Sequence, residues 1–245
     1  MTLLPLLLGL GGTDVISGDR PGFLNSSTLV GTGIWQVETG LNFDHARHSS
    51  DSASLPTALR YGWSEELELR ASTSGWNRVD AHGAPDAAGL GPLTIGVKAP
   101  LPRDWADLDL HWADSVAWVA ELRLPGGTQD ESDGSFSPSL SAVASWTASE
   151  LWQAGATLGL AYEPDDASMV LNFAASASAP IEERTSIFFE CGWFPQTRGG
   201  SDPLYVGSGL IFLPTNDVQL DLSFDAGLGD ANGDWLAGVG LCWRW

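Results

Sequence analysis

The sequence predicts an all-β fold: a closed, antiparallel, up-and-down barrel of about twelve strands that spans a membrane. Three observations predict it. Apolar and polar residues alternate in short runs along most of the chain, the connections between runs differ in length with a regular order, and tryptophans gather near the ends of runs. A protein core would explain the first observation, but the second and third favour lipid around the barrel.

The first run shows the alternation plainly. Trp35, Leu41 and Phe43 point to one face and Gln36 and Glu38 to the other, because successive side chains on a strand point to opposite faces. Within Gly31–Ala46 the run covers Trp35–Phe43, and eleven more runs have the same period: Ser54–Trp63, Leu67–Gly75, Leu93–Leu101, Val116–Leu124, Pro138–Trp146, Trp152–Tyr162, Met169–Ala179, Thr185–Phe194, Leu204–Leu213, Val218–Leu228 and Trp235–Trp245.

The connections indicate which side of the membrane each end faces. Connections after even-numbered runs are mostly tight, as at Ser64–Glu66, and connections after odd-numbered runs are mostly longer. This asymmetry is typical of outer-membrane barrels, whose long loops lie on the external side. One link after an even-numbered run, Lys98–Ser115, is the exception and would be a long periplasmic connection. The expected external loops are Asp44–Ala53, Trp76–Pro92, Pro125–Ser137, Pro195–Pro203 and the shorter Gly229–Asp234.

Charged residues lie in the middle of the polar faces, where a water-filled lumen would accommodate them. Glu38 is expected beside Arg60 and Arg244, and Glu68 beside Arg60, so that opposite charges form either a ladder that stiffens the wall or a selectivity filter. A soluble β-sandwich, the alternative fold, would turn these charges to bulk solvent. The predicted lumen-lining residues are Gln36, Glu38, Arg60, Glu68, Arg70, Lys98, Glu121, Arg123, Glu190, Asp221, Asp225 and Arg244.

Composition excludes some functions and favours others. The chain has 31 acidic and 11 basic residues and a net charge of −20, which disfavours nucleic acid as a partner and suits weak association of divalent cations with acidic loops. The 12 tryptophans suit girdles at a membrane interface. Expected partners are outer-membrane lipid, the barrel-assembly machinery and a small-molecule solute. Cys191 and Cys242 fall on non-adjacent strands and opposite faces, so we expect no disulfide.

No residue pattern predicts an enzyme. His45 and His48 beside Asp44 could in principle form a catalytic or metal-binding set, but no motif fixes a partner opposite them, and the other histidines are His82 and His111. Asp230–Asp234 lacks the order and the final acidic ligand of a calcium loop and is expected to be a tight turn. We therefore expect no catalytic residue, no metal and no cofactor.

The two ends of the chain have their own features. Residues 1–12 are apolar and end in small residues, as the remnant of a secretory signal peptide would, although the usual positive charge is missing and an ordinary strand or coil is the alternative. The C-terminus, with Gly240, Trp243 and the final Trp245, resembles the signal by which the assembly machinery recognises outer-membrane barrels, in which the last residue is usually Phe.

Further motifs carry a resemblance to a family. Ser17, Asp19, Arg20 and Pro21, followed by Gly33, Gln36, Glu38 and Gly40, together with Gly91–Lys98 and Leu122–Gly127, resemble the transporter-like outer-membrane barrel family linked to meta-pathway phenol degradation. The resemblance runs from about Asp14 to Trp245. It implies a barrel in the cell outer membrane of a Gram-negative envelope, with residues 31–245 as the barrel. It also implies that residues 13–30 are periplasmic or plug the lumen through Asp19, Arg20 and Pro21.

The leading functional hypothesis is a porin-like barrel that passively admits small solutes, hydrophobic or aromatic ones by the resemblance. The lumen charges would set selectivity and the N-terminal segment would act as a gate. The alternative is a non-conducting barrel that serves surface adhesion or membrane structure through its acidic loops. A lumen plugged by paired charges would favour the alternative, and a continuous water-filled path would favour the channel.

Overall fold

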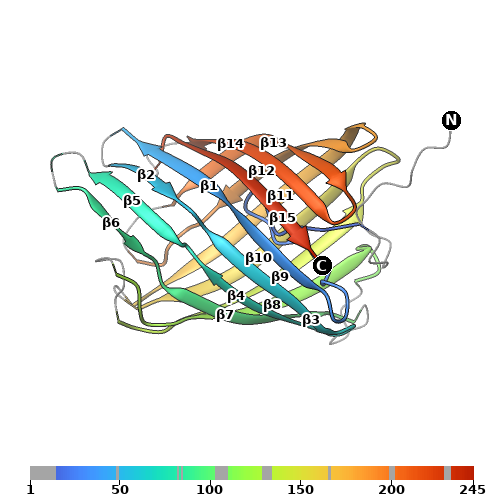
Figure 1. Cartoon of the computed structure of the whole chain (residues 1–245), viewed down its shortest axis with the longest axis horizontal. Coiled ribbons are helices and arrows are strands. Elements are labelled where there is room, and N and C mark those ends of the chain that lie inside the picture. Colours follow the sequence, from blue (N-terminus) through green and yellow to red (C-terminus); the bar gives the residue numbers. More distant parts are fainter. Residues whose placement is uncertain are drawn as a thin grey trace.

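The computed structural model describes residues 15–47, 50–81, 83, 85–102, 110–128, 134–164, 167–198, 202–228 and 233–245. Among these residues the structure contains no helix that is long and apolar enough to cross a membrane. The described chain forms one antiparallel sheet of 15 strands, which closes on itself because β1 pairs with β15 (Figure 1).

The strands follow one another around the ring in chain order, except where one strand of the wall is interrupted and counted as two, as described below. Their bounds are β1 Trp35–Ala46, β2 Ser50–Ser54, β3 Thr57–Ser64, β4 Leu67–Thr73, β5 Trp76–Ala81, β6 Ala87–Leu90, β7 Leu93–Pro100, β8 Ser115–Arg123, β9 Ser137–Thr147, β10 Gln153–Glu163, β11 Ser168–Glu182, β12 Thr185–Trp193, β13 Leu204–Thr215, β14 Val218–Leu228 and β15 Trp235–Arg244.

These strands make a ring of twelve staves, as the alternation predicts. We use stave for one complete strand of the barrel wall, whether it is continuous or made of two short strands in line. Three pairs of strands, β2 with β3, β4 with β5 and β6 with β7, each continue one stave across a break of two residues. The breaks fall at Leu55–Pro56, Ser74–Gly75 and Gly91–Pro92. Proline has no N–H to donate to the ladder, and Gly75 has a positive φ of 69°, so pairing is interrupted at these positions and resumes beyond them.

Two of the predicted external loops are therefore wrong in part. Asp44–Ala53 contains most of β2 and the end of β1, and Trp76–Pro92 contains the β5–β6 hairpin, which projects beyond the ring at the end away from the C-terminus (Figure 1). At Gly75 and Pro92 the sequence pattern ended a strand at its breaker, because a glycine or proline inside an alternating run has the same signature as a turn. The strands extend further on this side than the pattern indicates.

The seam between the first and last strands completes the barrel. Ten residue pairs run from Gln36 opposite Arg244 to His45 opposite Trp235. Trp35 and Trp245 also exchange backbone hydrogen bonds of 3.1 and 3.0 Å. Closure matters because a sheet edge in hydrocarbon would leave backbone N–H and C=O groups without partners.

The outer face of the sheet is apolar and the inner face is polar, which is the reverse of a soluble barrel. Large apolar side chains such as Leu222, Phe224 and Leu158 are about half exposed on the outside, whereas Gln36 and Arg60 on the inside are each 1% exposed. Trp35, Tyr61, Trp63, Trp243 and Trp245 form a group of neighbouring rings at one end of the wall. An apolar band with an aromatic girdle and a polar interior is the arrangement of an outer-membrane barrel, and the chain belongs in that membrane.

A charge on the outer face should cost stability according to its depth. We expect Leu222→Arg, in the middle of β14, to lower the free energy of unfolding by about 2–4 kcal/mol, and Leu228→Arg, on the same face at the strand end, to lower it by about 0–1 kcal/mol. Urea unfolding of the barrel refolded into vesicles measures both values. Equal costs at the two positions would contradict the assignment of this face to lipid.

Candidate functional site

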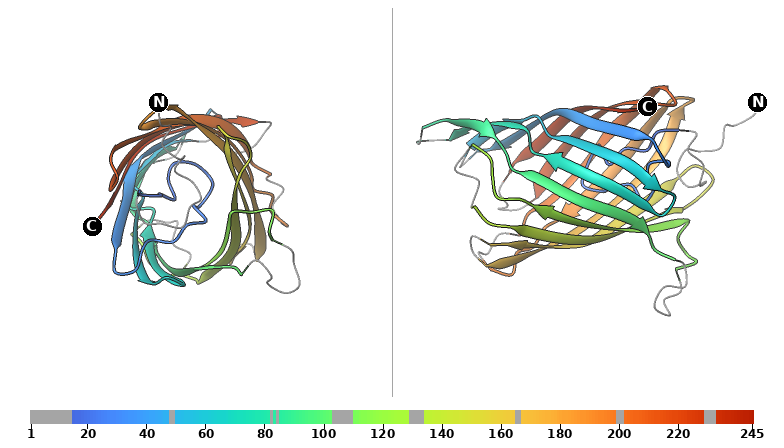
Figure 2. Two further views of the ribbon diagram at one scale, coloured as in Figure 1. Left: turned by 90° about the vertical axis from the view of Figure 1, so that its right-hand side faces the viewer. Right: turned by 60° about the horizontal axis from the view of Figure 1, so that its bottom comes forward.

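Residues 15–34, which we call the lumen segment, lie inside the barrel (Figure 2, left view, blue). The segment starts near the β13–β14 turn, where the Ile16 N–H donates to the Asn216 carbonyl at 2.7 Å. It ends near the β3–β4 turn, where the Gly33 N–H donates to the Gly62 carbonyl at 2.7 Å, and then enters β1. The segment thus loops into the lumen from the end of the barrel that carries the C-terminus.

One wall of the lumen is basic and carries its own counterions. Arg60 on β3 donates from Nε to Glu68 at 2.8 Å and from an Nη to Glu38 at 2.8 Å. Arg70 on β4 donates to Glu68 at 3.1 Å and to Glu121 on β8 at 3.2 Å. Arg60, Glu68 and Glu38 are at most 2% exposed. Burial of charges is tolerated here because every one of them has a partner of opposite sign.

Asp19 of the lumen segment sits against this basic wall. Its carboxylate contacts Arg70, Arg60 at 3.3 Å and Lys98 at 3.4 Å, and it accepts the Ser26 N–H at 2.7 Å. Burial alone would raise the pKa of Asp19, but the charges of Arg60, Lys98 and Arg70 outweigh burial and hold this pKa below its usual range. The side chain is therefore ionised throughout the physiological pH range.

Arg20, the next residue, points to a different and acidic wall. Its guanidinium lies 3.5 Å from Asp221 on β14 and donates to the Val239 carbonyl at 3.3 Å. Gly40 on β1 and Gly240 on β15 are register partners, and a side chain at either one would collide with the Arg20 guanidinium. The seam of the barrel thus provides the space that this arginine occupies.

The innermost part of the segment is held by Phe23. Its N–H donates to Glu190 on β12 at 2.8 Å. Its ring packs against Phe194 and Tyr205, with centroids 5.4 and 5.7 Å away. Glu190 in turn lies beside Asp225 on β14 across the side-chain-free Gly207, and both carboxyl groups are at least 90% buried. Glu190 on β12 lies across the ring from the basic wall, while Asp221 and Asp225 lie on β14, which is separated from β3 by β15 and β1.

The predicted lumen-lining residues divide into three sets. Seven of them surround Asp19 or its partners, and three form the acidic wall, while Arg123 and Arg244 lie nearer the barrel ends and bond Glu163 at 2.6 Å and Asp217 at 2.8 Å. Glu38 contacts Arg60 as expected, whereas Arg244, which also stands opposite Gln36, pairs with Asp217. The seven are Gln36, Glu38, Arg60, Glu68, Arg70, Lys98 and Glu121, and the three are Glu190, Asp221 and Asp225.

Several partners in the site carry no sequence signal. The carbonyls of Ser17 and Thr28 accept hydrogen bonds from Gln36, Arg60 and Lys98, at distances between 2.8 and 3.2 Å. Backbone atoms of an irregular segment cannot be placed from a side-chain pattern. Gln219 is also part of the site, donating to the Arg20 carbonyl at 2.9 Å. Its place on the polar face of β14, two residues from Asp221, is the signal that could have identified it.

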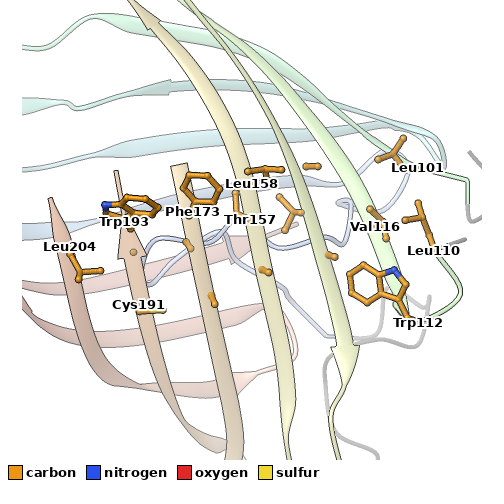
Figure 3. Close-up of a pocket in the computed structure, with 17 residues that line it drawn as sticks. Leu101, Leu110, Trp112, Val116, Thr157, Leu158, Phe173, Cys191, Trp193 and Leu204 are labelled. Carbon is orange, nitrogen blue, oxygen red and sulfur yellow. The ribbon is translucent and has the colours of Figure 1, made fainter. Parts of the chain in front are cut away.

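Two hollows of different character adjoin the wall. A polar one of about 270 Å³ lies in the lumen beside Arg20, Phe23, Asp44 and Asp225. An apolar one of about 600 Å³ lies along the wall from β8 to β13 and is lined by Leu158, Phe173 and Trp193 among others (Figure 3). Leu158 and Trp193 are exposed on the outer face, and Phe173, their partner in register, shares that face, so this hollow opens to the outside of the wall. The lumen is the candidate functional site.

The remaining sequence candidates lie apart from the lumen segment. His45 contacts Asp51 and stacks on Trp235 at 5.5 Å at the end of β1, while His48, His82, residues 1–12 and Asp230–Ala231–Asn232 fall outside the described residues. Within the described part of the chain, no group of three or more His, Cys, Asp or Glu residues is placed to hold a metal ion. Cys191 is exposed on the outer face and Cys242 is buried, and both thiols are free. Trp243 and Trp245 lie at the closing seam, and their role in assembly stays a prediction.

Comparisons with known proteins agree on architecture. A family model described as "Putative MetA-pathway of phenol degradation" matches residues 18–245. Among solved structures, the chain is similar to an outer membrane channel from Pseudomonas putida F1, with 14% identity, a TM-score of 0.66, and coverage of 92% of this chain and 99% of that one. A search of curated proteins finds no match to the sequence.

Two further solved structures share the fold. The NanC porin has 10% identity and a TM-score of 0.59, with coverage of 85% and 98%. The translocator domain of the autotransporter NalP from Neisseria meningitidis has 10% identity and a TM-score of 0.53, with coverage of 86% and 87%. At these identities the likeness shows the fold, a closed outer-membrane barrel, and the function has to be argued from the lumen.

Removing the central cation should destabilise the barrel. Arg60→Gln leaves Glu38, Glu68 and Asp19 buried with less compensation, so we expect the free energy of unfolding to fall by about 3–5 kcal/mol. The matched control is Arg78→Gln, which breaks an ion pair with Asp80 that is half exposed and should cost no more than about 1 kcal/mol. Urea unfolding in vesicles measures both, and equal costs would contradict a structural role for the cluster.

The contribution of Asp19 should depend on pH in a defined direction. Its pKa in the folded barrel lies below the ordinary aspartate value of about 3.9, so its stabilisation is present above that value and is lost as the pH falls through the folded-state pKa. We expect the stability difference between wild type and Asp19→Asn to be constant from pH 7 to pH 5 and to shrink only below about pH 4. A difference that already declines between pH 7 and pH 5 would show a raised pKa instead.

Proposed function

The chain belongs to the family of the matching model, and from that premise we propose that it is an outer-membrane channel through which small solutes diffuse passively. One observation carries the proposal: the lumen is lined by charged side chains, and much of what neutralises them is a segment that is not part of the wall. The strand ladder is continuous around the ring without the lumen segment. The segment could therefore leave without opening the barrel wall.

The contacts that hold the segment are of the kind that exchange with water. They include ion pairs at Asp19 and Arg20 and hydrogen bonds to Glu190 and Glu68, and Phe23 adds aromatic contacts with Phe194 and Tyr205. A solvated lumen would hydrate the same groups after the segment leaves. We infer that the lumen segment is the gate and that Asp19 and Arg20 are the charges that close it.

The proposed solutes are small and include aromatic or other hydrophobic molecules, as the family description suggests. The charged residues of the two walls would set selectivity by sign and size, since a low-dielectric wall strengthens the field across a narrow lumen. Phe23, Phe194 and Tyr205 provide an aromatic surface in the path. No step of passive diffusion needs a catalytic group or a cofactor.

A second function is favoured by a specific observation. The lumen segment and the paired charges occupy the centre of the barrel, as expected of a non-conducting barrel that serves adhesion or membrane structure. Under that function the ion pairs are permanent and exist to support the wall. The two functions differ in whether relaxing the contacts of the lumen segment opens a path for ions.

Single-channel recording in planar bilayers distinguishes them. We expect small or rare openings from the wild-type barrel, and at least about tenfold higher open probability when Asp19→Asn and Arg20→Gln are combined, because each substitution removes charge-assisted hydrogen bonds. Arg184→Gln, in the exposed β11–β12 turn, is the control and should behave as wild type. If neither form conducts while both keep heat-modifiable folding, the barrel is not a channel.

A further inference from the structure

The carboxylate of Asp19 is bound in the way that a protein binds a free carboxylate ligand. Arg60, Arg70 and Lys98 converge on it from three neighbouring staves, β3, β4 and β7, and the Ser26 N–H adds a fourth donor. Its side chain is 8% exposed. Convergent charged donors are the usual means of recognising a carboxylate, and arginine is favoured because its planar fork matches the two oxygens.

The wall alone leaves a place for a negative charge beside Lys98. Three fully or nearly buried cations face Glu38 and Glu68, which are equally buried, and Glu121, which contacts Arg70 at 3.2 Å and has a quarter of its side chain exposed. Lys98 is 0% exposed, and its two described polar contacts, to Asp19 and to the Thr28 carbonyl, are both with the lumen segment. When the segment leaves, this buried ammonium needs a new anion or water.

We propose that Arg60, Arg70 and Lys98 form a binding site for the carboxylate of a small organic acid, and that Asp19 occupies the site as an internal substitute for that ligand. The proposal rests on the proposed channel function and specifies its solute: a monocarboxylate, aromatic or aliphatic. An acid that enters the lumen competes with Asp19, and its binding releases the segment. The solute thereby opens its own path.

The opposite wall restricts the ligand to one negative charge. Glu190 lies on β12, across the ring from the basic wall, and Asp221 and Asp225 lie on β14, between β12 and the closing seam. A second carboxylate on the solute would point toward those groups, and like charges in a narrow lumen repel each other strongly. Arg20 occupies that side in the closed state, 3.5 Å from Asp221. A dicarboxylate should therefore bind more weakly than a monocarboxylate of the same ring.

The buried thiol of Cys242 provides a direct readout of segment release. Cys242 is 0% exposed on β15 and lies under Gly18 of the lumen segment, whereas Cys191 is exposed on the outer face. In a Cys191→Ala barrel, a polar maleimide should label Cys242 only when the segment moves. Benzoate is the probe, benzamide the uncharged control of the same shape, and phthalate the dianionic control.

We expect saturating benzoate to raise the rate of Cys242 labelling by about tenfold, the factor expected when one charge-assisted hydrogen bond of the closed state is replaced. Benzamide should have no effect and phthalate a smaller one, and Lys98→Gln or Arg70→Gln should abolish the response to benzoate. Equal rates with benzoate and benzamide would overturn the proposal, as would a response unchanged in both of those variants.

Titration calorimetry separates this proposal from the channel function. The Asp19→Ala barrel should bind benzoate saturably, at least about tenfold more tightly than the Asp19→Ala, Arg70→Gln barrel does. No saturable binding to the Asp19→Ala barrel, with its Cys242 rapidly labelled, would overturn the site even if the barrel conducts. Saturable binding to a barrel that never conducts would leave the site standing and overturn the channel.

Discussion

The structure depends on one constraint: no backbone polar group of a membrane-spanning strand can face hydrocarbon without a partner. The pairing of β1 with β15 satisfies it by removing both sheet edges. Closure then forces every second side chain into a confined interior, so that polar residues needed by the alternation cannot escape to bulk solvent. The buried ion pairs at Arg60, the space for Arg20 at the seam and the accommodation of the lumen segment are all consequences of that enclosure.

Enclosure also explains why the segment is polar where it meets the wall. An empty charged lumen would leave Lys98 to water alone, whereas Asp19 and the carbonyl of Thr28 offer it direct partners. Asp19 and Arg20 are adjacent in sequence and reach walls of opposite charge, so the segment matches the field across the lumen with two consecutive residues. At these two residues the match between the segment and the walls is electrostatic.

The sequence predicts the ring well because lipid imposes the same alternation on every stave. The number of staves, their order and the inward face of residues such as Glu38, Glu68 and Asp221 all follow from a period of two. The pattern fails at Gly75 and Pro92, because breakers inside a stave and breakers at its end are chemically the same. The alternation also does not determine the register between strands. Arg244 and Glu38 both face inward, but only the observed pairing shows that Arg244 stands opposite Gln36.

The position of the lumen segment could not be derived from its residues alone, because a chain without periodicity has no preferred face. Its contacts depend on the wall already being formed: Gly40 and Gly240 make room for Arg20 only when β1 and β15 meet, and Arg60 and Lys98 converge only when β3, β4 and β7 are in register. The segment therefore has its binding site only in a closed barrel. It follows that the contacts of the lumen segment depend on the closed wall, whereas the strand ladder of the wall does not include the segment.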